Sequence, residues 1–328
     1  MTLAIIGAGS WGTALAIVLA PKFDRVSLWV YEEDLAGRMK ASRENDIYLK
    51  GFALPEKVEI LTDLGQTVDR ASLVIGVMPS RHARKLYSRL KPHLDDSMIF
   101  VSATKGIESG TLLRMSEVIR EVTGAPKIAA LSGPTFAREV ARGEPAAVVV
   151  ASDDGEVAKQ VQTAFSGPTL RLYTNHDPIG VEVGAALKNV IAIGAGVCQG
   201  LGLGNNTLAA LITRGLAEIT RLACAMGGEP KTLAGLAGLG DLVLTCSGEL
   251  SRNRRVGIEL ARGRKIEQIT ESTPMVAEGV ETCSAAVNLG ARFGVDLPII
   301  QQMNAVLHEG KSPREALRDL MERSLKGE

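Results

Sequence analysis

The sequence lacks the residue patterns of most metal, disulfide and hydrolase sites. None of its four cysteines forms a C-x-x-C pair with another, so neither a zinc site nor a disulfide framework is indicated. The four histidines have no metal-ligand spacing and there is no G-x-S-x-G motif, so we expect no bound metal and no serine hydrolase. Reduced cysteines that serve mainly in packing are typical of a cytoplasmic protein, and we expect that location.

The chain also has no excess of positive or negative charge. Lys plus Arg number 37 and Asp plus Glu number 37, so no overall field favours nucleic acid or an anionic membrane, and neither is expected as a partner. The longest charge-free stretch, 189–213, carries five glycines with Gln199, Asn205 and Asn206, which would interrupt a lipid-facing helix. We therefore expect a buried helix followed by a turn, without membrane insertion. The N-terminal apolar run has no basic leader and is read as a strand rather than a signal peptide.

The 328 residues suffice for two domains, and the pattern of apolar residues changes near residue 180. Before that point short β-branched runs alternate with helical stretches, which predicts a Rossmann-like, doubly wound parallel sheet over residues 1–180. Helical periodicity then dominates, which predicts an all-α domain over residues 181–328. The expected strands are 3–6, 26–30, 73–77, 98–102, 127–131 and 146–151, and the expected later helices are 208–226, 253–262, 280–293 and 298–307.

A glycine loop ends the first expected strand, in the order Gly7-Ala8-Gly9-Ser10-Trp11-Gly12. In a G-x-G-x-x-G phosphate loop the three glycines permit a tight turn, a close approach of the pyrophosphate and close packing of helix on strand. A glycine turn without a ligand is the alternative, and the motif alone does not exclude it. The second expected strand is followed by Tyr31-Glu32-Glu33-Asp34, where a dinucleotide-binding fold places an acidic side chain for the adenosine ribose.

Lys188 interrupts an otherwise apolar helical stretch. Burying a cation is costly unless it is paired or functional, so the sequence predicts a lysine that exchanges a proton with an alcohol or ketone. Its pKa would then be lowered by desolvation and neighbouring cations. A lysine that reaches the surface from a helix end is the structural alternative.

Two polar clusters follow Lys188 along the chain. The glycine-rich turn 235–240 ends in Asp241, which either caps a helix or holds the lysine ammonium in place. Ser251-Arg252-Asn253 offers a hydroxyl, a guanidinium and an amide near a helix start, a set that suits a phosphate group. A solvated basic face is the alternative for this second cluster.

These motifs together resemble one family, the NAD(P)-dependent glycerol-3-phosphate dehydrogenases of the bacterial and eukaryotic soluble type. The resemblance covers nearly the whole chain and rests on seven segments in the family's order. They are 7–12, 103–106, 131–137, 187–189, 235–241, 251–254 and 276–280. It implies reversible reduction of dihydroxyacetone phosphate to sn-glycerol 3-phosphate, a precursor of glycerophospholipids, and a homodimer formed through the helical domain. The small-residue helix 184–200 would permit close packing in such a dimer.

The resemblance also implies roles for individual residues. Lys188 would donate and accept the proton, with Lys105 beside the substrate and Asp241 orienting the lysines. The residues that would bind substrate are Lys105, Gly133, Thr135, Lys188, Asp241, Ser251, Arg252 and Asn253. Those that would bind NAD(H), with NADP(H) as an alternative, are Gly7, Gly9, Ser10, Trp11, Gly12, Tyr31, Lys105, Ala137, Arg252, Val276 and Glu278.

One departure from many bacterial members bears on the cofactor. They place Arg or His at the end of the second strand, where this chain has three consecutive carboxylates, Glu32 to Asp34. These would repel the 2′-phosphate of NADPH, so NADH is the expected cofactor unless Arg38 or Lys40 folds back. Two rival functions stay open: a 3-hydroxyacid or 6-phosphogluconate dehydrogenase, and a redox sensor that binds NAD(H) without turnover.

Overall fold

The chain forms two compact units in a computed structural model, which describes residues 1–271, 276–325 and 327. Unit 1 comprises Met1–Lys105 and Leu113–Glu182, and unit 2 comprises Gly106–Leu112 and Val183–Glu328. This division differs from the expected one in two respects. Unit 1 extends to Glu182, and the short segment Gly106–Leu112 belongs to unit 2 although it lies within the N-terminal half of the sequence.

Unit 1 is built on an eight-stranded sheet in the order β3-β2-β1-β4-β5-β6-β7-β8. All neighbouring strands are parallel except β6 and β7, which are antiparallel. The strands are β1 (Thr2–Ile6), β2 (Arg25–Trp29), β3 (Val58–Leu61), β4 (Leu73–Gly76), β5 (Ile99–Ser102), β6 (Ile128–Ser132), β7 (Ala146–Ala151) and β8 (Leu170–Asn175). The predicted doubly wound fold is confirmed, with an antiparallel pair that the sequence did not indicate.

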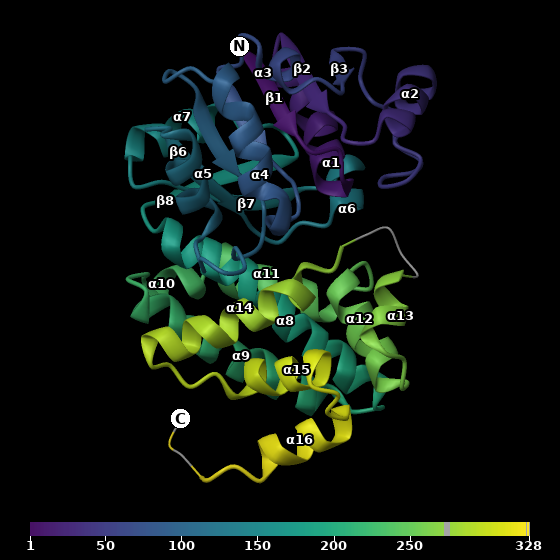
Figure 1. Cartoon of the computed structure of the whole chain (residues 1–328), viewed down its shortest axis with the longest axis vertical. Helices are drawn as coiled ribbons and strands as arrows, with labels where there is room; N and C mark the ends of the chain where they lie inside the picture. The colour runs from purple at the N-terminus through teal and green to yellow at the C-terminus, as the bar shows by residue number, and fades with distance from the viewer. Residues whose placement is uncertain (272–275, 326, 328) are drawn as a thin grey trace. The chain divides into compact units, whose positions relative to one another are not determined.

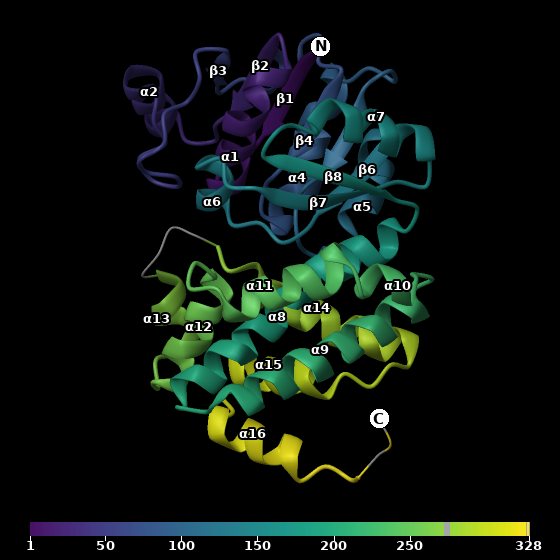
Figure 2. The same ribbon diagram turned by 180° about the vertical axis from the view of Figure 1, so that it is seen from behind.

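Helices cover both faces of this sheet because its central strands bury apolar side chains on each side. One hydrophobic cluster contains residues of α1 (Ser10–Leu19), α2 (Glu33–Ser42) and α7 (Gly155–Phe165). A second contains residues of α3 (Leu64–Val68), α4 (Ser80–Leu90) and α5 (Met115–Thr123). Figure 1 shows α4 and α5 in front of the sheet, and Figure 2 shows α7 in front of the opposite face. Short helical segments complete the unit: η1 (Ala20–Lys22), η2 (Lys91–His93) and α6 (Ala137–Ala141).

The sequence-based prediction missed β3 and β8. β3 has only four residues, and β8 alternates buried Leu170 and Leu172 with exposed Arg171 and Tyr173. A continuous β-branched run marks a strand that is covered on both faces. An edge strand with one solvent-exposed face has a weaker hydrophobic pattern. The six strands that were predicted are the ones with strongly apolar runs.

The regular elements of unit 2 among its described residues are helices. Its elements are α8 (Pro178–Gly200, whose first five residues belong to unit 1), α9 (Asn205–Ala225), α10 (Pro230–Leu233), the π-helical turn η3 (Leu236–Gly240), α11 (Asp241–Ser247), α12 (Arg252–Ala261), α13 (Ile266–Glu271), α14 (Glu278–Phe293), α15 (Pro298–His308) and α16 (Pro313–Met321). All four helices expected from periodicity are present. The shorter α10, α11, α13 and α16 were not predicted, because elements of one to three turns carry little periodicity.

Helix α8 is the core of this unit. Its glycines allow close approach of a neighbouring helix: a Cβ on Gly196 would lie 1.9 Å from the Arg254 carbonyl oxygen of α12, and one on Gly200 would lie 2.6 Å from the Ala261 Cβ of the same helix. The helix has the length and hydropathy of a membrane span, and its most apolar window is completely buried in the fold. The small residues of α8 thus pack within this chain, and the homodimer itself stays a prediction.

Candidate active site

The glycine loop between β1 and α1 is a tight turn that packs closely on its neighbours. Gly7 has φ +119°, and a Cβ there would lie 2.6 Å from the Val77 carbonyl oxygen. A Cβ on Gly12 would lie 1.9 Å from the Gly7 carbonyl oxygen, whereas one on Gly9 would meet nothing within 4 Å. Two glycines are thus needed for packing, and the third leaves open space beside the N-terminus of α1. No side chain caps that terminus, so its N–H groups suit a pyrophosphate.

The other predicted residues of this loop are held by their surroundings. The Ser10 hydroxyl donates a hydrogen bond of 2.7 Å to the Tyr48 carbonyl oxygen, and half-buried Trp11 packs against the hydrophobic cluster under α1. Ala137 is the first residue of α6, which packs against α1. Ala137 therefore lies on an element adjacent to the phosphate loop.

The segment after β2 is acidic, and several side chains in and near it form hydrogen bonds or ion pairs within the protein. Tyr31 is 73% exposed and its ring lies edge-on to Trp29. Glu32 accepts a hydrogen bond of 2.8 Å from the Tyr48 hydroxyl, and burial raises the pKa of that phenol to about 12, with Glu32 adding to the shift. Arg38 forms a two-point ion pair with Asp46, at 2.8 and 3.2 Å. Of the two cations that could fold back to a 2′-phosphate, Arg38 is thus paired with Asp46, and Lys40 is exposed on α2.

Three predicted substrate residues meet at the carboxyl ends of β5 and β6. Lys105 Nζ and the Thr135 hydroxyl each donate to the carbonyl oxygen of Gly133, at 3.2 Å. Gly133 has φ +153°, and a Cβ there would lie 2.9 Å from the Cα of Val148 in β7. Glycine is required at this position because the neighbouring strand leaves no room for a side chain.

Lys188 of α8 lies in a buried polar cluster with two residues of α11. Its Nζ donates to Asp241 Oδ1 at 2.5 Å and to the Thr245 hydroxyl oxygen at 2.7 Å. Lys188 is 5% exposed and Asp241 is fully buried, so the lysine does not reach the surface. The Thr245 hydroxyl donates in turn to the Asp241 carbonyl oxygen, at 2.6 Å. The cluster therefore holds the lysine amine in one position.

A π-helical turn places Asp241 in this cluster. The Gly240 N–H donates to the Gly235 carbonyl oxygen, five residues back, and α11 begins at the next residue. A Cβ on Gly238 would lie 2.1 Å from the Leu233 carbonyl oxygen, so the turn needs a glycine there. Single π-helical turns occur frequently at functional sites.

The polar residues at the start of α12 cap this helix and bind it to neighbouring helices. Buried Ser251 is the N-cap, and its hydroxyl oxygen accepts from the Arg254 N–H. The amide of Asn253 donates to Asn189 Oδ1 on α8 and accepts from the Gly279 N–H on α14, both at 3.0 Å. Asn253 therefore ties three helices together, and it contacts α8 at the residue that follows Lys188.

The remaining predicted residues surround the start of α12. Arg252 is exposed, and desolvation by the neighbouring protein lowers the pKa of its guanidinium while the charge of Glu278 opposes this shift. Glu278 is the first residue of α14, and Val276 lies two residues before it; both are half-buried. A cation thus lies at the N-terminal end of α12, where the first N–H groups also attract an anion.

The sequence did not single out Thr245 or Asn189. Thr245 lies four residues after Asp241, a spacing that puts both on one face of a helix once α11 is recognised. Asn189 is adjacent to Lys188, and its contact with Asn253 spans 64 residues. Among the described residues, no group of three or more His, Cys, Asp or Glu side chains is placed to hold a metal ion.

Comparisons with known proteins identify the family of this chain. Residues 2–158 match the model of the NAD-dependent glycerol-3-phosphate dehydrogenase N-terminus, and residues 177–318 match that of the C-terminus. The chain belongs to the NAD-dependent glycerol-3-phosphate dehydrogenase family. A glycerol-3-phosphate dehydrogenase (NAD(P)+) of Koribacter versatilis is 55% identical over 326 residues, covering 98% of this chain and 97% of that protein.

Solved structures of glycerol-3-phosphate dehydrogenases share the fold. The one from Coxiella burnetii is 39% identical, with a TM-score of 0.95 over 98% of this chain and 99% of that chain. The one from Saccharomyces cerevisiae is 28% identical, with a TM-score of 0.83 and the same coverage. The expected family, enzyme class and NAD(H) or NADP(H) cofactor are confirmed.

Proposed function

We propose that this glycerol-3-phosphate dehydrogenase reduces dihydroxyacetone phosphate to sn-glycerol 3-phosphate, reversibly, with Lys188 as the proton donor. The observation that carries the assignment of Lys188 is its buried cluster with Asp241 and Thr245. A buried amine that is held by a carboxylate and a hydroxyl is positioned for proton transfer. The product would supply glycerophospholipid synthesis.

The chemistry divides between the cofactor and the protein. When bound, the reduced nicotinamide supplies a hydride to the carbonyl carbon. Lys188 gives a proton to the carbonyl oxygen, which becomes the hydroxyl, and Asp241 keeps its charge and orients the ammonium group. Lys105 would stabilise the negative charge that develops on the oxygen. In the reverse direction Lys188 takes the hydroxyl proton as hydride leaves.

The substrate phosphate would be bound by Ser251, Arg252 and Asn253, with help from Gly133 and Thr135. The charge of Arg252 and the N-terminal end of α12 favour a dianion at this place. Asn253 has one amide N–H beyond the bond to Asn189 and could donate it to a phosphate oxygen. Its bonds to α8 and α14 would keep that N–H in position.

For the cofactor we propose the loop Gly7–Gly12 as the pyrophosphate site and a preference for NADH. Ser10, Trp11, Tyr31, Ala137, Arg252, Val276 and Glu278 would line the dinucleotide, with Lys105 near the nicotinamide. Glu32 to Asp34 follow β2, and Arg38 is paired with Asp46, so a 2′-phosphate would meet repulsion. The test is kcat/KM for both cofactors; a clear advantage of NADPH would overturn the preference.

One spectrophotometric assay separates the candidate functions. Oxidation of NADH on addition of dihydroxyacetone phosphate is expected, whereas reduction of NAD+ only by a 3-hydroxyacid or 6-phosphogluconate would indicate another dehydrogenase. Binding of NADH without turnover of any of these would indicate a sensor. Lys188→Ala should lower kcat by roughly 10² or more with cofactor affinity nearly unchanged. Exposed Lys231→Ala is the matched control and should keep full activity.

We further propose that the enzyme is a cytoplasmic homodimer that does not insert into membranes. With α8 buried in the fold, a dimer would use other surfaces of the helical unit. Light scattering coupled to size-exclusion chromatography gives the mass in solution. A mass of one chain, 34.7 kDa, at micromolar concentration would contradict the dimer.

A further inference from the structure

Tyr48 lies between α2 and β3 and contacts two parts of the proposed cofactor site. The Ser10 hydroxyl of the glycine loop donates to the Tyr48 carbonyl oxygen at 2.7 Å, and half-buried Tyr48 packs against the hydrophobic cluster under α1. The Tyr48 hydroxyl donates to Glu32 Oε1 at 2.8 Å. All three residues belong to unit 1. One tyrosine therefore joins the proposed pyrophosphate loop to the acidic segment after β2.

A buried asparagine fixes the backbone at Tyr48. Asn45 is fully buried, and its Oδ1 accepts from the Tyr48 N–H at 2.9 Å. Its amide nitrogen donates to the Ala8 carbonyl oxygen of the glycine loop and to the Thr13 hydroxyl of α1, both at 2.8 Å. An amide nitrogen carries two N–H donors, and both are used here. The backbone that carries the tyrosine ring is thus tied to the glycine loop.

The Glu32 carboxylate bonds to Tyr48 and not to the helix that follows it. Glu32 is the N-cap residue of α2, a position from which a side-chain oxygen often accepts an N–H of the first turn. No such capping bond forms, and the phenol holds Oε1. A carboxylate has about four acceptor sites, so Oε2 keeps the capacity to accept a ribose hydroxyl.

The phenol of Tyr48 is a neutral donor at physiological pH. Burial raises its pKa to about 12, and the hydrogen bond to Glu32 adds to the shift. A hydrogen bond to a carboxylate is about twice as strong as one between neutral groups. This contact therefore holds the Glu32 carboxylate in one orientation, three residues after the end of β2.

We propose that Tyr48 is a positioning residue that sets cofactor specificity by holding the Glu32 carboxylate at the 2′ position of the adenosine ribose. This inference rests on the proposed use of NADH. A fixed carboxylate accepts the 2′-hydroxyl of NADH and repels the 2′-phosphate of NADPH. Without the phenol the carboxylate can rotate, which weakens the attraction and relieves the repulsion. Tyr48 thus acts through Glu32 and not as a ligand of the cofactor.

The test is Tyr48→Phe, which removes the hydroxyl and keeps the ring that packs under α1. The Kd values for NADH and NADPH are measured by nicotinamide fluorescence. We expect the Kd for NADH to rise about fivefold and that for NADPH to fall about twofold, so their ratio changes about tenfold. The kcat at saturating NADH should stay near the wild-type value, because hydride transfer does not involve the 2′ position.

A double-mutant cycle separates action through Glu32 from direct contact with the cofactor. Glu32→Ala should change the ratio of the two Kd values by at least about tenfold, because it removes the carboxylate altogether. Adding Tyr48→Phe to Glu32→Ala should then change the ratio by less than about twofold, since the phenol has lost the group that it positions. A tyrosine that bound the cofactor itself would keep its full effect.

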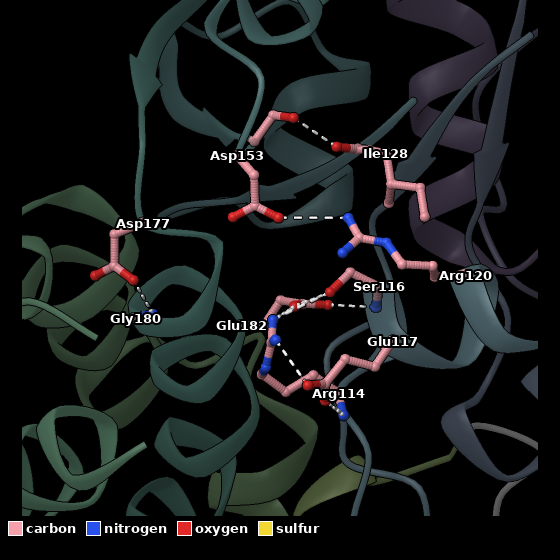
Figure 3. Close-up of polar contacts among 10 residues, drawn as sticks. Arg114, Ser116, Glu117, Arg120, Ile128, Asp153, Asp177, Gly180 and Glu182 are labelled. Carbon is pink, nitrogen blue, oxygen red and sulfur yellow. Dashed lines mark hydrogen bonds and ion pairs between the residues drawn. The ribbon is translucent and has the colours of Figure 1, made fainter. Parts of the chain in front are cut away.

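The matched control is Tyr173→Phe, which removes the same hydroxyl from an exposed tyrosine of β8 in the same unit and should leave both Kd values unchanged. Ser116→Ala is the control for lost stability. The Ser116 hydroxyl of α5 donates to buried Glu182 at 2.6 Å, beside the guanidinium of Arg114 (Figure 3). Its removal should lower Tm and leave the ratio of the two Kd values at the wild-type value.

The proposal is overturned if folded Tyr48→Phe keeps the wild-type ratio, if its effect is as large in the Glu32→Ala background, or if Tyr173→Phe shifts the ratio equally. Failure of the proposed cofactor preference is a separate result, seen as wild-type protein that binds NADPH more tightly than NADH. The cycle decides the role of Tyr48 in that case too: a shift that vanishes with Glu32→Ala supports it, and an unchanged ratio overturns it. Binding is measured without turnover, so the result does not depend on the substrate.

Discussion

Replacing Gly257 of α12 with alanine should damage the substrate site from a distance. A Cβ on Gly257 would lie 1.9 Å from the Ile193 carbonyl oxygen and 2.7 Å from the Val197 nitrogen, both backbone atoms of α8. The first contact is about 1.6 Å shorter than the separation of roughly 3.5 Å at which non-bonded atoms attract. Backbone atoms of a buried helix cannot rotate away, so α12 must shift relative to α8.

The magnitude follows from overpacking and helix propensity. Overpacking a core costs about 1–3 kcal/mol, and a clash with backbone belongs at the upper end. Alanine regains about 1 kcal/mol of helix propensity over glycine, which leaves a net loss of about 2 kcal/mol. A domain of this size then melts about 4–8 °C lower. The same shift lengthens the 3.0 Å bond between Asn253 and Asn189, one turn away, so KM for dihydroxyacetone phosphate should rise about tenfold.

Calorimetry and steady-state kinetics on the purified variant check both numbers. Gly37→Ala is the control, since Gly37 lies in α2 and a Cβ there meets nothing within 4 Å. It should stabilise the protein by up to about 1 kcal/mol with unchanged kinetics. A Gly257→Ala enzyme with wild-type Tm and KM would refute the claim that close contact of α8 and α12 positions the phosphate site.

Two further predictions concern buried carboxylates. Asp241→Asn should lower kcat by roughly 10² with little change in the Kd for NADH, because Lys188 loses the charge that orients it; unchanged kcat would contradict this role. Glu218 accepts from two N–H groups at the start of α15, and burial raises its pKa to about 7 from 4.5. The folded state then binds this proton at higher pH than the unfolded state, so its stabilising contribution falls from pH 4.5 to 7, by at most about 3 kcal/mol. Glu218→Gln should flatten that part of the stability–pH curve in urea titrations, and an unaltered slope would show that Glu218 titrates normally.

Much of the fold was predictable because its signals are local. The six strands with apolar runs are buried on both faces, and the glycine loop needs a positive φ at Gly7 that a glycine pattern reveals. The order of a sheet-containing domain followed by a helical domain was indicated by the change in periodicity. The edge strands β3 and β8, the antiparallel direction of β7 and the short helices were not predicted, because strands exposed on one face, strand direction and single turns leave weak sequence patterns.

The sequence by itself determined the family, the chemistry available and the residue types of the site, since motifs such as 7–12 and 251–254 are contiguous and each encodes its own backbone geometry. The tertiary structure decided which side chains act together. Lys188 meets Asp241 and Thr245 across 53 and 57 residues, and Arg114 meets Glu182 across 68. No local propensity specifies such pairs. They form because packing of α8 against its neighbours brings distant polar groups into the same dry interior, where each must find a partner.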